Sequence, residues 1–167
     1  MNIEIIPISK RINKNDFDCG IEDLNQYLRQ FAIPNDKKNI GKTFAAVYEN
    51  NKSQVLGYYS VSMAQILFNE LPDSIKKGIP KYPVPAMRIG KLAVDLRFQG
   101  NNIGALLLRD AFLRAINVSS EVAIYCIIVD AINKKAKSFY MKYGFIPFYK
   151  NPLTLVLPIK TVKDAII

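Results

Sequence analysis

Residues that could bind a phosphate group gather between Val94 and Gly104. An apolar stretch ending at Val94 is followed by a polar turn with Gln99 and Gly100, and a helical pattern begins near Asn102. Side chains in the turn are small or polar, so backbone N–H groups at the positive end of the helix stay accessible. Such groups bind phosphate-type anions, and the segment predicts a cofactor that carries a pyrophosphate. The alternative is an ordinary strand–helix connection, because turns that contain glycine are common.

The same segment has the form of a known signature. Gln99-x-x-Asn102-x-Gly104 resembles the Arg/Gln-x-x-Gly-x-Gly/Ala motif of the GNAT acetyltransferases, whose loop holds the pyrophosphate of acetyl-CoA. Further segments resemble one branch of that family, the GNAT toxins of toxin–antitoxin pairs (the TacT/AtaT type). These segments are FDCG (17–20), LNQYLR (24–29), TFA (43–45), KYPVPA (81–86) and SFYMKYGF (138–145). The resemblance extends from about Phe17 to Leu157.

One position departs from the signature. The family has glycine where this chain has Asn102. Glycine lets the backbone approach the phosphate and tolerates a positive φ, whereas asparagine tolerates that conformation next best but adds a side chain. We therefore expect weaker cofactor binding than a glycine would give.

The resemblance implies a single GNAT domain over residues 1–167. It implies a mixed α+β fold in which two central parallel strands of a mixed β-sheet splay apart, flanked by helices. Acetyl-CoA is the implied co-substrate, without a metal. The pantetheine arm would pair with the backbone of Leu92, Ala93 and Val94, although the side chains there also suit plain core packing. The pyrophosphate would be held by the amides of Gln99, Gly100, Asn101, Asn102, Ile103, Gly104 and Ala105, and the CoA arm would touch Asn133 and Phe139.

The resemblance also assigns a catalytic role to Tyr140. On its own, Tyr140 is a candidate for an aromatic side chain on the buried face of a helix. The family has a tyrosine at this place in the Phe-Tyr pair, where its hydroxyl can protonate the thiolate that leaves when an amine attacks the thioester. The chain contains no histidine, so the commonest general base is absent.

The lack of an obvious base favours one kind of acceptor. A free α-amine has a pKa of ~7.7–8.0 and is partly neutral near pH 7, while a lysine ε-amine at ~10.4 needs a base to deprotonate it. Asp95 or a water molecule remains an alternative base. The toxins that the chain resembles acetylate the amino acid on charged tRNA and so block translation. Two other functions stay open: acetylation of a small amine or a protein N-terminus, and a GNAT-like binding module with weakened catalysis.

Charge fits a polyanionic partner. The 23 Lys and Arg residues against 14 Asp and Glu give a formal net charge of +9, an excess that favours nucleic acid. Each single lysine is more simply explained as a solvated surface residue, but as a set they suit tRNA phosphates. The candidate contacts are Lys37, Lys38, Lys42, Arg88 and Lys91, with further lysines at 76, 77, 81, 134, 135 and 142. By resemblance alone, the partners include a ribbon-helix-helix antitoxin and a second copy of the chain in a homodimer.

The elements that position these residues follow from the apolar spacing. We predict strands over 3–8, 43–48, 54–63, 89–94 and 123–129, and two final strands over 145–149 and 153–157. Helices are expected from Leu24 to a stop before Pro34, from about Asn102, and from an Asn133 cap to Gly144. Residues 71–85 read as an insertion loop. The strand–helix–strand unit around the loop makes its two strands parallel.

Composition limits the class of protein and its expected location. Half of the 167 residues are hydrophobic, which suits a folded chain with a sizeable core. Two cysteines make no disulfide framework, and Cys126 lies in an apolar strand pattern as a buried thiol. The longest apolar run, 122–129, is far short of the ~20 residues that span a bilayer. With no signal-peptide pattern at the start, we expect a cytoplasmic protein without a membrane association.

Overall fold

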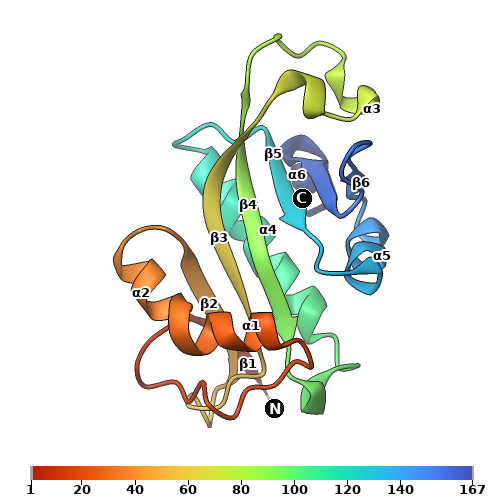
Figure 1. Cartoon of the computed structure of the whole chain (residues 1–167). Helices are drawn as coiled ribbons and strands as arrows, with labels where there is room; N and C mark the ends of the chain where they lie inside the picture. The colour runs from red at the N-terminus through yellow and green to blue at the C-terminus, as the bar shows by residue number, and fades with distance from the viewer. Residues whose placement is uncertain (1, 167) are drawn as a thin grey trace. The chain divides into compact units, whose positions relative to one another are not determined.

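The computed structural model describes residues 2–166 as a mixed α/β structure (Figure 1). The seven strands follow the order β1-β2-β3-β4-β5-β7-β6 in one mixed sheet. Packing divides the chain into two compact units. The first contains the described residues up to Ser62 together with Gly90–Ala111, and the second contains Met63–Ile89 together with the described residues from Phe112 onward. Strands β3 and β4 and helix α4 each contribute residues to both units. That residues 1–167 form a single domain stays a prediction.

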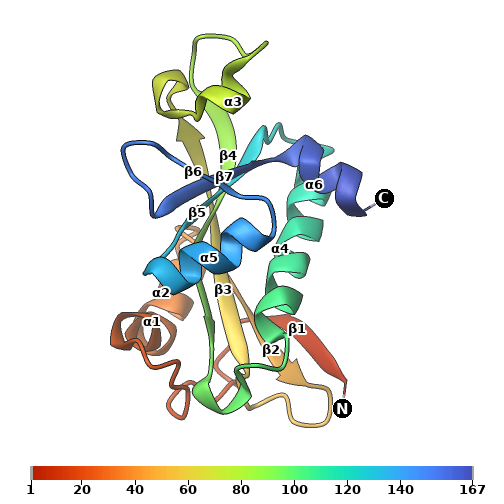
Figure 2. The same ribbon diagram turned by 90° about the vertical axis from the view of Figure 1, so that its right-hand side faces the viewer.

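The first unit is built on an antiparallel meander. Strand β1 (Ile3–Pro7) pairs with β2 (Lys42–Tyr48), and β2 pairs with β3 (Gly57–Ile66). The predicted strands over 3–8, 43–48 and 54–63 are confirmed, although β3 begins three residues later than expected. Figure 2 shows helices α1 (Glu22–Gln26) and α2 (Ala32–Lys37) on one side of β3 and the start of α4 on the other.

The expected end of the first helix before Pro34 is wrong. Between α1 and α2 lies a five-residue π-helix, η1 (Tyr27–Phe31), and helical structure continues to Lys37. Proline lacks an N–H and ends a helix when that N–H is needed inside it. Here the hydrogen-bond pattern changes at Phe31 and Ala32, so Pro34 falls in the first turn of α2. Backbone N–H groups there have no acceptor within their own helix, and the proline removes no bond.

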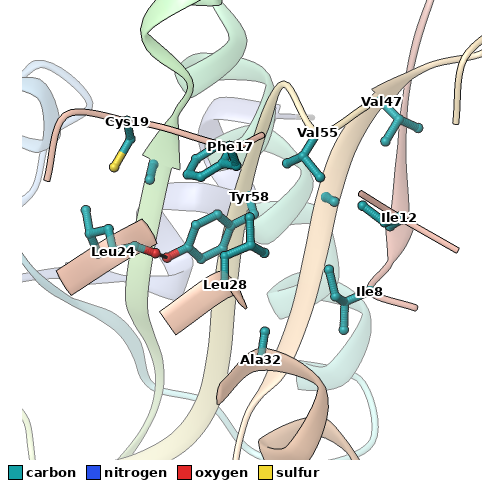
Figure 3. Packing of buried hydrophobic residues seen from close by; sticks show 12 residues of the cluster. Ile8, Ile12, Phe17, Cys19, Leu24, Leu28, Ala32, Val47, Val55 and Tyr58 are labelled. Atoms are coloured by element: carbon teal, nitrogen blue, oxygen red, sulfur yellow. Dashed lines mark hydrogen bonds between the residues drawn. The ribbon is translucent and has the colours of Figure 1, made fainter. Parts of the chain in front are cut away.

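The core of the first unit lies between the sheet and the helical segment of residues 22–37. Figure 3 shows Phe17, Leu24, Leu28 and Tyr58 converging there. The Tyr58 ring is fully buried, and its hydroxyl donates to the Leu24 carbonyl at 2.6 Å. This bond ties β3 to the end of α1 within an apolar cluster.

Strand β4 (Val84–Val94) leads into a short 3-10 turn, η3 (Leu96–Phe98), and then into helix α4 (Ile103–Ser119). Gly57 sits where β3 approaches this segment. A Cβ at that position would lie 2.8 Å from the Ala93 carbonyl oxygen and 3.0 Å from Leu107 Cδ1. No side chain fits at 2.8 Å from a backbone oxygen, so the bare glycine lets the strand lie against the first turns of the helix.

The second unit holds the parallel pair. Ala86–Ile89 of β4 pair with Cys126–Val129 of β5 (Cys126–Asp130) in the predicted parallel orientation. Strand β4 begins five residues earlier than expected, within the predicted loop, and β5 begins three residues later than expected. The pairing covers only the first part of β4. The remaining strands and helices are α3 (Asp73–Lys76), α5 (Lys134–Lys142), β6 (Ile146–Pro147) and β7 (Thr154–Pro158), with η2 (Phe68–Glu70) and α6 (Ile159–Ile166).

Most of these elements confirm the sequence predictions. The insertion loop carries one short helix, α3, and both final strands are present and antiparallel. Cys126 is fully buried, and burial raises the pKa of its thiol to about 12. Helix α6 was not predicted, although Ile159, Val162 and Ile166 follow helical spacing. Among the described residues, no helix has the length and apolar character that a membrane span requires.

Candidate active site

The segment predicted to bind phosphate, in the first unit, has the backbone conformation that its sequence predicts. Asn102 adopts φ +61° and Gly100 adopts φ +84°, both in the left-handed region. Asparagine enters this region more readily than most residues, and glycine enters it without cost. At position 102 the family's signature has a glycine, and this chain has the left-handed conformation there with an asparagine.

Amide donors are grouped at the start of α4. The Leu106 N–H donates to the Asn102 carbonyl at 3.1 Å, which marks Asn102 as the residue where intrahelical bonding begins. The N–H groups of Ile103, Gly104 and Ala105 come before that bond, where an α-helix offers no acceptor of its own. They lie at the positive end of a 17-residue helix and can hold an anion.

Side chains of the loop brace its own backbone. Gln99 Nε2 donates to the Val94 carbonyl at 2.9 Å, and Asn101 Nδ2 donates to the Phe98 carbonyl at 3.1 Å. Both side chains therefore fix the turn between β4 and α4. The loop can offer its backbone N–H groups, as expected, while its amide side chains hold the shape.

A buried carboxylate supports the same turn and was not singled out as structural from the sequence. Asp95 is 1% exposed and accepts hydrogen bonds from the Arg97 N–H and guanidinium and from the Asp18 N–H. Burial acts to raise the pKa of Asp95, but these bonds outweigh it and lower the pKa. A carboxylate with its pKa lowered and its oxygens occupied is a poor proton acceptor, which argues against Asp95 as the general base.

The residues predicted to face the pantetheine arm lie at the end of β4 in the first unit. Ala93 is buried in the core beside Tyr58, while Leu92 and Val94 are half-buried. The core-packing role is therefore shown for Ala93. The proposed contacts are made by backbone atoms, so the packing of these side chains is compatible with them.

Three further predicted residues come together in the second unit. The Asn133 side-chain oxygen caps α5 by accepting from the Ala136 N–H at 2.9 Å, and Gly144 ends the helix at φ +93°, both as predicted. Phe139 meets Tyr140 edge to face at 5.3 Å between ring centroids, and Phe145 meets Tyr140 likewise at 5.5 Å. The ring of Tyr140 is thus fixed by two aromatic neighbours.

Tyr140 is held in its protonated form. It is 3% exposed, and burial is the main cause that raises its pKa, with the negative charge of Asp130 as a second cause. A raised pKa keeps the phenol neutral at physiological pH, so the hydroxyl can donate a hydrogen bond or a proton. It also excludes a base formed by the phenolate near pH 7.

The candidate nucleic-acid contacts differ in what they touch. Lys37 and Lys38 are exposed at the end of α2. Lys42 forms an ion pair with Asp36 at 3.1 Å, and Arg88 forms one with Asp130. Lys91 lies over the Tyr27 ring, 5.2 Å from its centroid.

Known proteins match this chain along nearly its whole length. The family model described as an acetyltransferase (GNAT) domain matches residues 74–153. A tRNA-acetylating toxin of Mycobacterium tuberculosis is 28% identical over 159 residues, which cover 95% of this chain and 93% of the toxin.

Solved structures agree with this match. AtaT complexed with acetyl-methionyl-tRNAfMet has a TM-score of 0.91 at 29% identity, covering 99% of this chain and 100% of AtaT. AtaTR bound with AcCoA has a TM-score of 0.87 at 30% identity, covering 99% of this chain and 98% of that one. Together with the loop geometry, these similarities identify the chain as a member of the GNAT acetyltransferases.

Proposed function

We propose that the protein transfers the acetyl group of acetyl-CoA to the α-amine of the amino acid on charged tRNA, and thereby acts as the translation-blocking toxin of a toxin–antitoxin pair. The observation that carries this proposal is the similarity over nearly the full length to AtaT complexed with acetyl-methionyl-tRNAfMet and to a tRNA-acetylating toxin.

The cofactor contacts in the proposal use the residues at the start of α4 and the end of β4. The amides from Gln99 to Ala105 would bind the pyrophosphate, and the backbone of Leu92–Val94 would pair with the pantetheine amides. Asn133 and Phe139 would contact the CoA arm. The left-handed Asn102 supports this arrangement, because it turns the chain into the helix whose first amides are open.

Tyr140 would act as the acid. Attack of the amine on the thioester carbonyl gives a tetrahedral intermediate, and its collapse breaks the C–S bond and releases CoA as a thiolate. A phenol that stays protonated can donate to that sulfur as it leaves. The amine loses its own proton to water, and an α-amine on an ester needs little help because a useful fraction is neutral near pH 7.

The nucleic-acid contacts in the proposal are exposed cations. Lys37 and Lys38 would meet tRNA phosphates directly, while Lys42 and Arg88 would exchange their carboxylate partners for phosphates. Lys91, next to the predicted pantetheine edge, would lie near the reactive end of the tRNA. A net charge of +9 supports contact with a polyanion.

The proposal includes the partners of such toxins. AtaT is bound to the C-terminus of the antitoxin AtaR in another similar structure, at a TM-score of 0.85 and 27% identity. We infer a ribbon-helix-helix antitoxin and a homodimer for this chain, and activity in the cytoplasm, where charged tRNA is used.

The direct experiment is to incubate charged tRNA with acetyl-CoA and the protein and then to release and analyse the amino acid. The proposal expects an N-acetylated amino acid and an amount of free CoA equal to it. Transfer to free amino acids or peptide N-termini, with none to charged tRNA, would instead identify a small-molecule or N-terminal acetyltransferase. Absence of transfer to any amine, with acetyl-CoA still bound, would identify a binding module.

A further inference from the structure

Four aromatic rings of the first unit form a continuous series from the core to the surface. Phe17 packs against Tyr58 at 5.5 Å between centroids, Tyr58 stacks on Tyr27 at 6.3 Å, and Tyr27 packs against Phe31 at 6.5 Å. Figure 3 shows the inner end of this series, with Phe17 beside Tyr58. At the outer end, Phe31 is 47% exposed.

The outer rings are held by polar contacts and by the π-helix. Tyr27 and Phe31 are the first and last residues of η1, where the Ala32 N–H reaches back to the Tyr27 carbonyl. The Tyr27 hydroxyl and Ser60 Oγ are 3.0 Å apart. A π-helical turn inside a helix is rare and is often found at functional sites. Here it ends on the half-exposed phenyl ring of Phe31.

A cation lies on the same series. Lys91 Nζ is 5.2 Å from the centroid of Tyr27. None of the ion pairs found among residues 2–166 includes Lys91, so its ammonium has no carboxylate to displace. The exposed Lys37 is the last residue of the helix that directly follows Phe31, and the exposed Lys38 comes next.

We propose that Phe31, together with Lys91 over the adjacent Tyr27 ring, binds the unpaired nucleotide at the 3′ end of the tRNA: the base stacks on the Phe31 ring and a neighbouring phosphate pairs with the Lys91 ammonium. This proposal rests on the proposed function, since a charged tRNA carries its amino acid on that nucleotide. We call Tyr27, Phe31 and Lys91 the terminal-nucleotide site.

The chemistry of the surface favours a nucleotide over an apolar group. Proteins bind single-stranded nucleic acid by pairing an aromatic platform with cations that follow the backbone. A ring that already packs against a neighbouring ring loses less conformational entropy when a base stacks on it than a ring without such a contact. The charge excess supplies the attraction for the phosphates. The side chain of the transferred amino acid is the other occupant to test, because it would also contact an exposed phenyl ring.

The test measures binding of uncharged tRNA by fluorescence anisotropy, using one transcript with its terminal nucleotide and one that lacks it. Phe31→Leu keeps an apolar side chain but removes the flat ring, and Phe31→Tyr keeps the ring. We expect Phe31→Leu to weaken binding of the intact transcript by about 5- to 150-fold and to leave the truncated one nearly unchanged. Phe31→Tyr should restore binding. Lys91→Gln should weaken binding and lower the salt dependence by about one phosphate contact.

Tyr149→Leu is the matched control, because it removes a ring that is 94% exposed in the second unit. Equal affinity of native and Phe31→Leu proteins for the intact transcript would overturn the proposal. So would an equal loss on both transcripts. A loss that appears only with charged tRNA and varies with the amino acid would assign Phe31 to the aminoacyl side chain instead.

The acetyl-transfer assay on the native protein separates this inference from the proposed function. Absence of transfer to charged tRNA would reject the proposed function itself. Normal transfer with no effect of Phe31→Leu on tRNA affinity would reject only the terminal-nucleotide site. The native and Phe31→Leu proteins should bind acetyl-CoA with equal affinity, which verifies that the exposed substitution leaves the fold intact.

Discussion

Replacing Tyr140 by phenylalanine removes one hydroxyl and keeps the ring. The two edge-to-face contacts at 5.3 and 5.5 Å involve only the ring, and they remain in the variant. Loss of one hydrogen-bonding group typically changes the free energy of unfolding by about 0.5–1.5 kcal/mol. Loss of a general acid lowers a rate by about 10²–10⁴-fold, which corresponds to about 2.7–5.4 kcal/mol of activation free energy. The effect on transfer should therefore exceed the effect on stability.

The assay is single-turnover transfer from saturating acetyl-CoA to charged tRNA, at a temperature where both proteins are fully folded. Acetyl-CoA affinity should be equal for the two proteins. Tyr143→Phe is a suitable control, because that hydroxyl belongs to a more exposed ring at the end of the same helix. If the protein is a toxin, cells should tolerate the Tyr140→Phe variant. A near-native transfer rate in that variant would refute the acid role and leave water as the proton carrier.

Four further predictions concern stability, cofactor and tRNA. Asn102→Gly should tighten acetyl-CoA binding in a calorimetric titration, and equal or weaker binding would contradict this. The free energy of unfolding should stay within about 1 kcal/mol of the native value, because glycine relieves the strain of the left-handed conformation but adds conformational entropy to the unfolded chain. Lys37→Glu with Lys38→Glu should weaken tRNA binding without changing acetyl-CoA affinity, and native affinity should fall steeply with salt; a salt-independent affinity would reject the phosphate contacts. Asp95→Asn should lower the free energy of unfolding at pH 7 by about 1–3 kcal/mol, a modest loss because the arginine partner is half exposed. The pKa of Asp95 is lowered in the folded protein, so the difference between native protein and variant should shrink as pH falls below about 4 and the native carboxylate becomes protonated. Burial raises the pKa of Cys126 to about 12, so its contribution to stability is fully present below about pH 9 and is lost as pH rises toward 12. Between those pH values, urea unfolding should show the free energy of unfolding of the native protein falling by up to about 1.4 kcal/mol per pH unit more than that of Cys126→Ala.

The sequence was sufficient for the parts of the fold that depend on local patterns. The parallel pairing of β4 with β5, the Asn133 cap and the glycine at the end of α5 each follow from residue types at fixed spacing, and all are confirmed. The turn between β4 and α4 was predictable for the same reason. Its backbone conformation is set by Gly100 and Asn102, which are adjacent to the helix that they open.

Features that depend on distant partners could not be predicted. In the π-helix at Tyr27–Phe31, the Tyr27 side chain contacts Tyr58 and Ser60, which are about thirty residues away in sequence. The π-helix also places Pro34 in the first turn of α2, where a proline removes no backbone hydrogen bond. The burial of Asp95 depends on an N–H group contributed by residue 18. A carboxylate beside an arginine in sequence looks like a surface pair until that contact is known.

The turn between β4 and α4 should be sensitive to substitution of Gly57, a residue that lies outside the turn. A Cβ at Gly57 would lie 2.8 Å from the Ala93 carbonyl oxygen of β4 and 3.0 Å from Leu107 Cδ1 of α4. A larger residue at position 57 must therefore push β3 away from the end of β4 and from the helix whose first amides we propose to bind the pyrophosphate. In a genetic selection for survivors of the active protein, Gly57→Ala should therefore recur among the loss-of-function alleles. The encoded proteins would still carry every residue that we propose to contact acetyl-CoA.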